Sequence, residues 1–161
     1  MGPIMKPLVK AVIVAMVLAG TANLQVSFAA GPRSLAPLST TPNADYVAGK
    51  AAVDAGDYEA AIAHLGKAVA ANPADADALN YLGYSHRRLG NLEESLNWYR
   101  KALAVNPNHR GALEYLGELY LEMDQPEQAE QQLATLGRVC IFGCPEYDEL
   151  KEAIDDYRAG Q

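Results

Sequence analysis

The sequence predicts an all-α fold, a right-handed solenoid of three helix–turn–helix units with a C-terminal capping helix. The first observation behind this prediction is a repeat: Gly49, Gly83 and Gly117 follow one another at steps of 34 residues, and Pro73 and Pro107 are separated by the same step. A fixed period of this length is typical of supersecondary units that stack on one another. The second observation is composition. Half of the residues are hydrophobic, and many of these are alanine, which has the highest intrinsic helix propensity.

The N-terminus has the layout of an export signal. Two lysines precede a short uncharged apolar run at residues 11–19, and small residues follow it. This is the pattern of a cleaved secretory signal, and the run is shorter than the roughly 20 residues that span a bilayer. We therefore expect a signal peptide at residues 1–29, cleaved after Ala29 or alternatively after Ala22, and no stable membrane anchor after cleavage. The expected location is the periplasm, with full secretion as the alternative.

The first repeat unit follows a leader. Residues 30–41 are rich in Pro, Ser and Thr and have no period, so we expect a flexible segment. The first unit is assigned to residues 42–75. Its first helix is predicted over residues 42–55, with Thr41 as N-cap and a proline at the first helical position. Its second helix is predicted over residues 58–71.

The second and third units follow the same plan. The second unit occupies residues 76–109, and Asp75 is a good N-cap for its first helix. Its second helix follows Asn91, which together with Glu94 resembles a capping box. The third unit is assigned to residues 110–143.

The last segment, residues 144–161, is predicted to be an amphipathic capping helix. One face carries an apolar stripe at spacings of three and four, and the opposite face is acidic. A helix of this kind covers the apolar flank that the last unit of a solenoid leaves exposed. The stripe consists of Tyr147, Leu150, Ile154 and Tyr157.

Two of the repeated glycines fall in the middle of predicted helices. Glycine costs about 1 kcal/mol relative to alanine at such a position. We therefore expect the second helix of the same unit to approach closely at Gly83 and at Gly117. The large residues that fill the space between units are predicted to be Leu65, Tyr99 and Leu133.

The residues that carry the period resemble the tetratricopeptide repeat, a helix–turn–helix family with the pattern W-x2-L-G-x2-Y…A-x3-F…P. The resemblance covers roughly residues 42–141. It is weakest in the first unit, where Asp45 stands in place of the large first hydrophobe. The central unit matches through Leu79, Leu82, Gly83, Ser95, Tyr99, Ala102 and Pro107.

The resemblance implies a concave groove, lined by the first helix of each unit, that binds a peptide or protein segment. The groove is expected to be rich in tyrosine, basic toward the first two units and acidic toward the third. A two-carboxylate clamp that some relatives use to bind chaperone C-termini is absent. Carried over position by position, the groove consists of Tyr46, Lys50, Asn80, Tyr81, Tyr84, Arg87, Arg88, Glu114, Tyr115 and Glu118. The function that this implies is a non-catalytic scaffold or adaptor in the periplasm.

Cys140 and Cys144 are the only cysteines. In an exported protein a local disulfide is the leading interpretation, and Gly143 and Pro145 interrupt the helix so that the two side chains can turn toward each other. Structural zinc requires four ligands, and the pair lacks the CxxC spacing of redox sites. A thiol-based metal-binding or redox function through this pair is kept as the alternative. A self-assembling module is a third possibility, and the oligomeric state is left open.

The composition also argues against several function classes. The formal net charge is −7, whereas a nucleic-acid interface needs a clustered cationic surface. No phosphate loop, metalloprotease helix or hydrolase elbow occurs in the sequence. We therefore expect no enzymatic activity, no catalytic residue, no resident metal and no cofactor.

Overall fold

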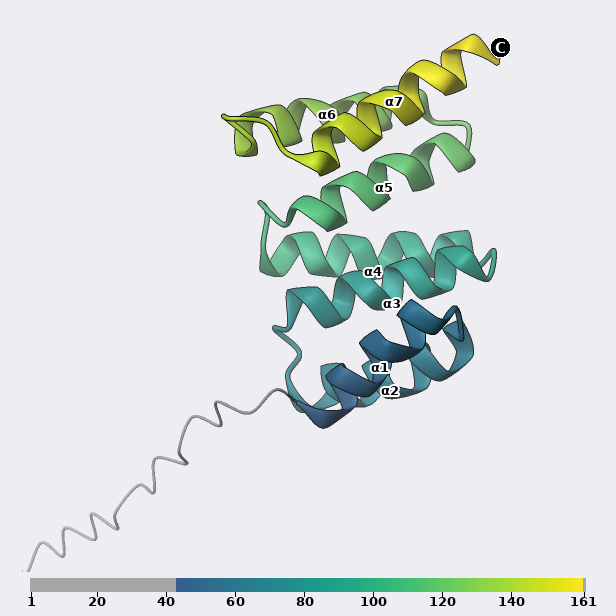
Figure 1. Cartoon of the computed structure of the whole chain (residues 1–161), viewed down its shortest axis with the longest axis vertical. Coiled ribbons are helices and arrows are strands. Elements are labelled where there is room, and N and C mark those ends of the chain that lie inside the picture. Colours follow the sequence, from purple (N-terminus) through teal and green to yellow (C-terminus); the bar gives the residue numbers. More distant parts are fainter. Residues whose placement is uncertain (1–42, 161) are drawn as a thin grey trace, which may run out of the picture. The chain divides into compact units, whose positions relative to one another are not determined.

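The computed structural model describes residues 43–160 of the chain. The predicted signal peptide and leader, residues 1–41, lie outside the described residues. Within residues 43–160 the structure has seven helices and no strand, which confirms the all-α prediction (Figure 1). None of these helices is both long enough and apolar enough to cross a membrane. The helices are α1 Ala44–Ala55, α2 Tyr58–Ala71, α3 Ala76–Arg88, α4 Leu92–Val105, α5 Arg110–Glu122, α6 Pro126–Val139 and α7 Pro145–Ala159.

The helices stack as three hairpins followed by a single helix. α1 packs on α2, α3 on α4 and α5 on α6, and each hairpin also contacts the next through α2 with α3 and α4 with α5. Figure 1 shows this order from α1 and α2 at one end to α6 and α7 at the other. The predicted solenoid of three units is therefore present. α7 packs against both α5 and α6, and its contact with α5 is more extensive than that between the first helices of neighbouring units.

Short polar residues begin the helices, though two of the predicted caps are wrong. The side chains of Asp57 and Asp75 accept backbone N–H groups at the starts of α2 and α3, as N-caps do. α1 begins at Ala44 rather than at the predicted residue 42, because the Asn43 side chain accepts the N–H of Asp45 (2.9 Å) and caps the helix there.

The capping box predicted at the start of α4 does not form. The N–H of Asn91 already donates to the carbonyl of His86 (2.9 Å) in the preceding turn, so it is not available to the carboxylate of Glu94. The Asn91 side chain makes no capping hydrogen bond either. The tight turn between α3 and α4 therefore uses the backbone donor that the capping box requires.

A residue in the left-handed backbone conformation lies in the turn between the two helices of each unit. Gly56 and Gly90 both have φ of 76°, and Asp124 has φ of 58° at the equivalent place in the third unit. This conformation carries little cost for glycine and is tolerated by aspartate. The turns thus recur at the predicted period of 34 residues.

The repeated glycines mark close helix approaches, which confirms the prediction at Gly83 and adds a further approach at Gly49. A Cβ atom at Gly83 would lie 2.6 Å from ring carbons of Tyr99 on α4, and one at Gly49 would lie 2.6 Å from Leu65 on α2. Both Tyr99 and Leu65 are fully buried. The glycines therefore let the two helices of a hairpin pack against each other with a large side chain between them.

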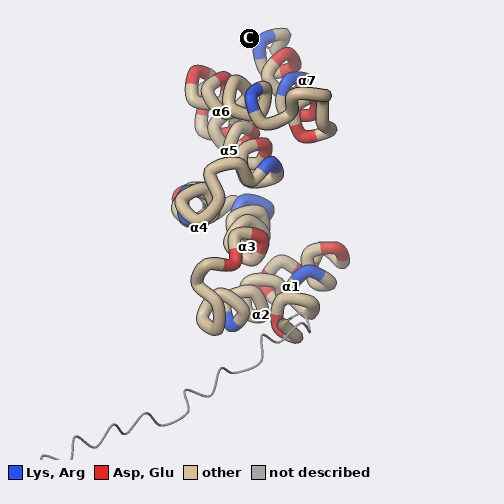
Figure 2. The backbone as a smooth tube through the Cα atoms, turned by 90° about the vertical axis from the view of Figure 1, so that its left-hand side faces the viewer, with Lys and Arg blue, Asp and Glu red and all other residues tan. Residues whose placement is uncertain are grey.

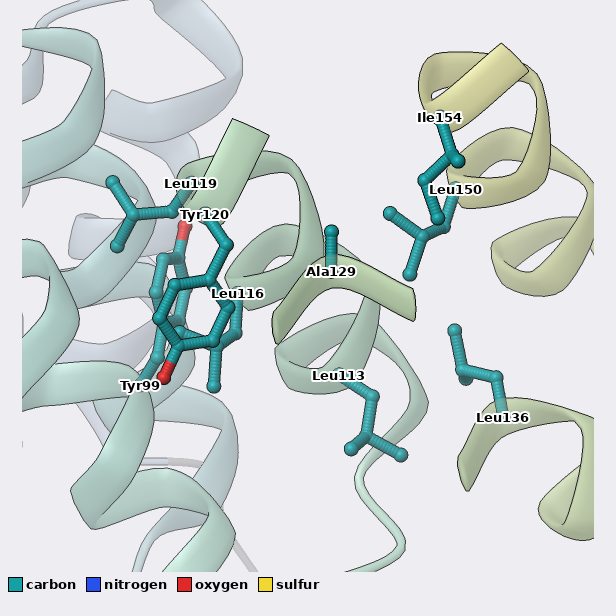
Figure 3. Packing of buried hydrophobic residues seen from close by; sticks show 9 residues of the cluster. All are labelled: Tyr99, Leu113, Leu116, Leu119, Tyr120, Ala129, Leu136, Leu150 and Ile154. Carbon is teal, nitrogen blue, oxygen red and sulfur yellow. The ribbon is translucent and has the colours of Figure 1, made fainter. Parts of the chain in front are cut away.

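The third unit departs from this pattern. A Cβ atom at Gly117 would lie 2.5 Å from Leu150, which belongs to α7 and not to α6 as predicted. Leu133, the expected filler, is only partly buried, whereas Leu136 and Leu150 are fully buried. Figure 3 shows Leu150 and Ile154 extending from α7 toward this part of the core. The capping helix thus supplies the side chain that the second helix supplies in the other units.

A disulfide joins Cys140 to Cys144 across the connection between α6 and α7. It confirms the predicted pairing. Gly143, with φ of 86°, reverses the chain within this short loop, and the side chains of Ile141 and Phe142 at its tip are exposed. The cross-link therefore constrains the corner from which α7 returns to pack on α5.

Candidate functional site

The candidate site lies on the face formed by the first helices of the units, which we call the groove face. It carries two adjoining hollows that share Tyr81 and Tyr115 in their walls. The tyrosine hollow, about 570 Å³, is lined by Lys50, Val53, Asp54, Ala55, Gly56, Tyr58, Tyr81, Tyr84 and Tyr115. The polar hollow, about 530 Å³, lies between α3, α5 and α7 and is lined by Asp77, Asn80, Tyr81, Asn106, Asn108, His109, Arg110, Gly111, Glu114, Tyr115, Pro145, Glu146 and Glu149.

A series of tyrosine rings runs along the groove face. Tyr58 contacts Tyr84 with ring centroids 6.1 Å apart, and Tyr84 contacts Tyr115 at 5.1 Å. Tyr46 contacts Tyr81 at 6.3 Å. These are the separations of favourable aromatic pairs. The structure therefore brings the predicted tyrosines together, and Tyr58 of α2 is an addition to them.

Three tyrosines of this face, Tyr46, Tyr81 and Tyr115, have raised pKa values, so their hydroxyls stay in the neutral form. Burial raises the pKa of Tyr46 to about 12, and the charge of Asp77 adds to the effect. Burial is also the main cause that raises the pKa values of Tyr81 and Tyr115. These hydroxyls can therefore act as hydrogen-bond donors at physiological pH.

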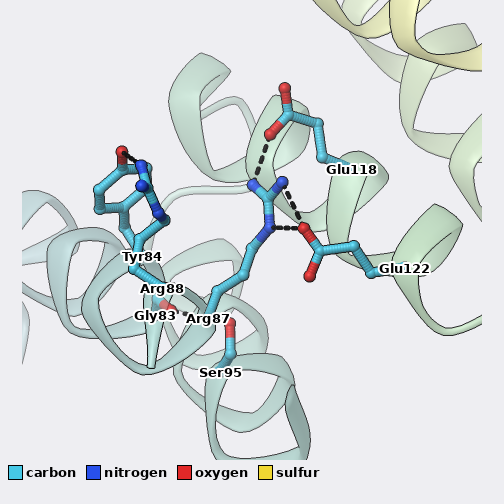
Figure 4. A network of polar contacts seen from close by, with 7 residues as sticks. All are labelled: Gly83, Tyr84, Arg87, Arg88, Ser95, Glu118 and Glu122. Carbon is cyan, nitrogen blue, oxygen red and sulfur yellow. Dashed lines mark hydrogen bonds and ion pairs between the residues drawn. The ribbon is translucent and has the colours of Figure 1, made fainter. Parts of the chain in front are cut away.

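Arg87 is not a free cation of the groove. Its Nε atom donates to Glu122 (2.8 Å) and its Nη1 atom donates to Glu118, so one guanidinium joins α3 to two turns of α5 (Figure 4). Only 13 % of the Arg87 side chain is exposed. Burial lowers the pKa of Arg87, but the hydrogen bond to Glu122 and the charge of Glu118 outweigh it and raise the pKa overall. Arg87 and Glu118 therefore connect the second unit to the third, and their charges largely cancel.

The other two predicted cations contact the aromatic rings. Arg88 donates to the hydroxyl of Tyr84 (2.8 Å), and its guanidinium lies 5.2 Å from the centre of the Tyr58 ring. Lys50 pairs with Asp54 (2.6 Å) and lies 5.5 Å from the centre of the Tyr81 ring. Such cation–π contacts fix the rings as well as the charges. The basic side chains that the sequence predicts at this end of the groove are thus mostly paired with other groups of the same chain.

The acidic end differs, because one carboxyl group is buried. Glu114 on α5 is only 4 % exposed and lies in the wall of the polar hollow. Burial, followed by the hydrogen bond to Glu149 and the charge of that carboxylate, raises the pKa of Glu114 far above its ordinary value. Figure 2 shows the acidic positions on α5, α6 and α7 that surround this end of the chain.

The residues of the groove face that the sequence did not predict include Tyr58 and Glu149. Tyr58 is the first residue of α2, a position at which the repeat pattern has no groove residue. Glu149 lies on the helix face that the sequence assigned to solvent, because the apolar stripe of α7 was the only signal for its orientation. Glu149 is exposed, and the contact between α7 and α5 also places its carboxyl group beside Glu114.

The predicted groove residues therefore fall into four groups. Lys50, Tyr81, Tyr84 and Tyr115 line the tyrosine hollow, and Asn80 and Glu114 line the polar hollow with Tyr81 and Tyr115. Tyr46 stacks beside Tyr81. Arg87, Arg88 and Glu118 line neither hollow.

The described residues include one group of three potential metal ligands, Cys140, Cys144 and Glu146, whose ligand atoms lie within 4.8 Å of one another. The two sulfur atoms of this group are bonded to each other, so neither is a thiolate in this state. In this state the pair does not offer the two thiolates that the alternative metal-binding function requires.

Comparison with protein families yields two matches that overlap along the chain. Both are to models described as Tetratricopeptide repeat, one over residues 46–110 and the other over residues 87–139. Together they cover more than half of the chain. No curated protein matches the sequence.

Several solved structures share the fold. A tetratricopeptide repeat protein from Parabacteroides merdae has a TM-score of 0.60 and 22 % identity, and the match covers 70 % of this chain but 43 % of that one. The TPR2B domain of yeast Sti1, solved as a complex with pHsp70, has a TM-score of 0.67 and 14 % identity over 73 % of this chain and 95 % of that one. The type III secretion chaperone SycD of Yersinia enterocolitica, solved with a peptide of the translocator YopD, has a TM-score of 0.62 and 17 % identity over 72 % and 88 %.

Proposed function

The chain belongs to the tetratricopeptide repeat family, and from this premise we propose that it is a non-catalytic adaptor that binds a peptide or protein segment along the groove face. The observation that carries the proposal is the series of tyrosine rings through Tyr58, Tyr84 and Tyr115, which borders both hollows. Tyrosine supplies a large contact area at low conformational cost and keeps a polar tip for hydrogen bonds.

Two of the structural neighbours support a peptide as the ligand class. The yeast Sti1 domain and the Yersinia chaperone SycD were both solved as complexes, the second with a peptide of YopD. Their ligands do not transfer to this chain, because identities of 14 % and 17 % establish the shared fold alone. The absence of the two-carboxylate clamp also argues against a chaperone C-terminus as the partner.

Export to the periplasm belongs to the same proposal. The signal-like pattern at residues 1–29 supports it, and so does the disulfide between Cys140 and Cys144, because disulfides persist in oxidising compartments. Cell fractionation with intact mass measurement tests this part. A chain that starts after Ala29 or Ala22 and is found outside the cytosol is expected, and a cytosolic chain that retains Met1 would contradict it.

Binding is tested by selecting peptides from a random display library on the purified protein. We expect peptides that bind the wild type and lose at least about tenfold in affinity, or about 1.4 kcal/mol, against the Tyr84→Ala variant. Tyr157→Ala is the matched control, since Tyr157 is a tyrosine of α7 that lines neither hollow. Failure to enrich any peptide, or equal binding to wild type and Tyr84→Ala, would refute the proposed function.

A further inference from the structure

We propose that the polar hollow receives an arginine side chain of the bound segment. This inference rests on the proposed function and names the chemistry that one part of the groove face recognises. It is carried by the unpaired acidic groups and the unsatisfied acceptor in the wall of that hollow.

The first observation is a buried acceptor without a partner. The Asn80 side chain lies in the wall of the polar hollow and is only 4 % exposed, and its Oδ1 atom accepts no hydrogen bond. Buried polar atoms without a partner are rare and costly in native proteins. An N–H donor that enters the hollow would satisfy this atom.

The second observation is a pair of carboxyl groups without a cation. Glu114 of α5 is buried beside Glu149 of α7, and the ion pairs found within residues 43–160 include neither residue. Glu118, one turn further along α5, is neutralised by Arg87. The chain thus places its own guanidinium against Glu118 and leaves Glu114, one turn earlier on α5, without a cation.

The remaining charges around the hollow are already paired. Asp77 accepts from His109 (2.9 Å), and Glu146 lies 3.6 Å from Arg110. The excess negative charge of the hollow therefore comes from Glu149 and, once it loses its proton, from Glu114. The titratable groups that face Glu114 are Asp77 of α3, His109 before α5, Arg110, Tyr115 and Glu118 of α5, and Glu146 and Glu149 of α7.

The spread of these acceptors favours arginine over a metal ion. A metal site requires several ligand atoms close together. Among the described residues, three potential ligand atoms lie within 4.8 Å of one another at Cys140, Cys144 and Glu146, and no such group occurs in this hollow. A guanidinium is planar and presents five N–H donors in several directions, so it can reach separated acceptors at once. The rings of Tyr81 and Tyr115 in the same wall offer faces on which it can stack.

Arginine binding should depend on pH in a defined direction. Because the pKa of Glu114 is raised, Glu114 retains a proton at neutral pH, and an incoming guanidinium competes with that proton. Binding should therefore become tighter as pH rises, by up to about tenfold per pH unit while the pH remains below the pKa of Glu114. A neutral side chain of the same shape would show no such dependence.

The test uses two short acetylated and amidated peptides of leucine and alanine that differ at one central residue, arginine in one and citrulline in the other. Citrulline keeps the size of arginine and removes its charge. Binding to the purified, isotope-labelled protein is followed by amide chemical shifts. We expect shifts at Asn80, Gly111, Glu114 and Glu149 with a dissociation constant at least tenfold lower for the arginine peptide.

Two variants and one ion complete the experiment. Glu114→Gln combined with Glu149→Gln should abolish the preference for arginine, while Glu152→Gln, which removes an exposed charge of α7 that lines neither hollow, should preserve it. Equal binding of both peptides, no shift at the hollow with either, or equal shifts with calcium chloride alone would overturn the inference. Display-selected peptides that depend on Tyr84 but not on arginine would overturn it and leave the proposed function intact.

Discussion

Two glycine-to-alanine substitutions should change stability in opposite directions. Gly83 and Gly66 both lie inside helices, in α3 and α2. A Cβ atom at Gly83 would lie 2.6 Å from two ring carbons of Tyr99, whereas a Cβ atom at Gly66 would have no atom within 4 Å beyond its chain neighbours and the adjacent backbone of its own helix. The same chemical change therefore meets a packed core at one site and open space at the other.

The magnitudes follow from two effects. Alanine is favoured over glycine inside a helix by about 1 kcal/mol, which benefits both variants. At Gly83 the methyl group must displace the Tyr99 ring by about 1 Å to reach an ordinary contact, and such overpacking costs about 1–3 kcal/mol or more. Tyr99 is fully buried, so its ring has no space into which to move. We expect Gly83→Ala to lose about 1–2 kcal/mol and Gly66→Ala to gain about 0.5–1 kcal/mol.

Urea denaturation followed by far-UV circular dichroism measures both changes with the disulfide intact. The expected result is a lower midpoint for Gly83→Ala and a higher one for Gly66→Ala, with similar slopes. Equal shifts of the same sign in both variants would refute the close approach of α3 and α4 at this glycine. Gly83→Leu, whose larger side chain intensifies the clash, should unfold the array.

Three further predictions concern side-chain pairs. Arg87→Ala should destabilise the fold by about 2–3 kcal/mol, since it leaves the partly buried Glu118 without its charged donor. Urea denaturation measures this loss. The loss should be much smaller when Arg87 and Glu118 are both replaced by alanine. Glu114 has a folded-state pKa raised above its unfolded value, so its contribution to stability is complete below about pH 4.5 and is lost as pH rises through the folded-state pKa. Glu114→Gln should remove this loss, and its stability advantage over wild type should grow from about pH 5 to about pH 9; a constant difference would contradict the assignment. Replacing Cys140 and Cys144 by serine should cost at most about 2 kcal/mol, because the closed loop is short, and thermal denaturation with thiol alkylation of the wild type checks both the cost and the pairing.

Much of the fold follows from local sequence signals. The bounds predicted for the second helix of the first unit are those observed for α2, and α7 begins at the predicted proline. These boundaries are set by residues next to them in the chain, such as the N-cap Asp57 and the left-handed Gly56. Where a local signal was wrong, as at Asn91, the cause was competition from a neighbouring turn for the same backbone N–H.

The candidate site was predictable to a smaller extent. The tyrosines of the groove face follow from their positions in the repeat, because the register of the repeat decides which side of each first helix they occupy. The charge of the groove did not follow from sequence. Arg87 pairs with Glu122, 35 positions later in the chain, and no local pattern reports such a pairing.

The sequence alone therefore determined the helices, their turns, the period of the stack and the tyrosine face, since each depends on neighbouring residues or on the repeat itself. The tertiary structure decided which charges remain available and where the last helix packs. Leu150 rather than Leu133 fills the space beside Gly117, and Glu149 lies beside Glu114. These contacts join residues that are far apart in the chain, so the energies of packing and desolvation that select them exist only in the assembled fold.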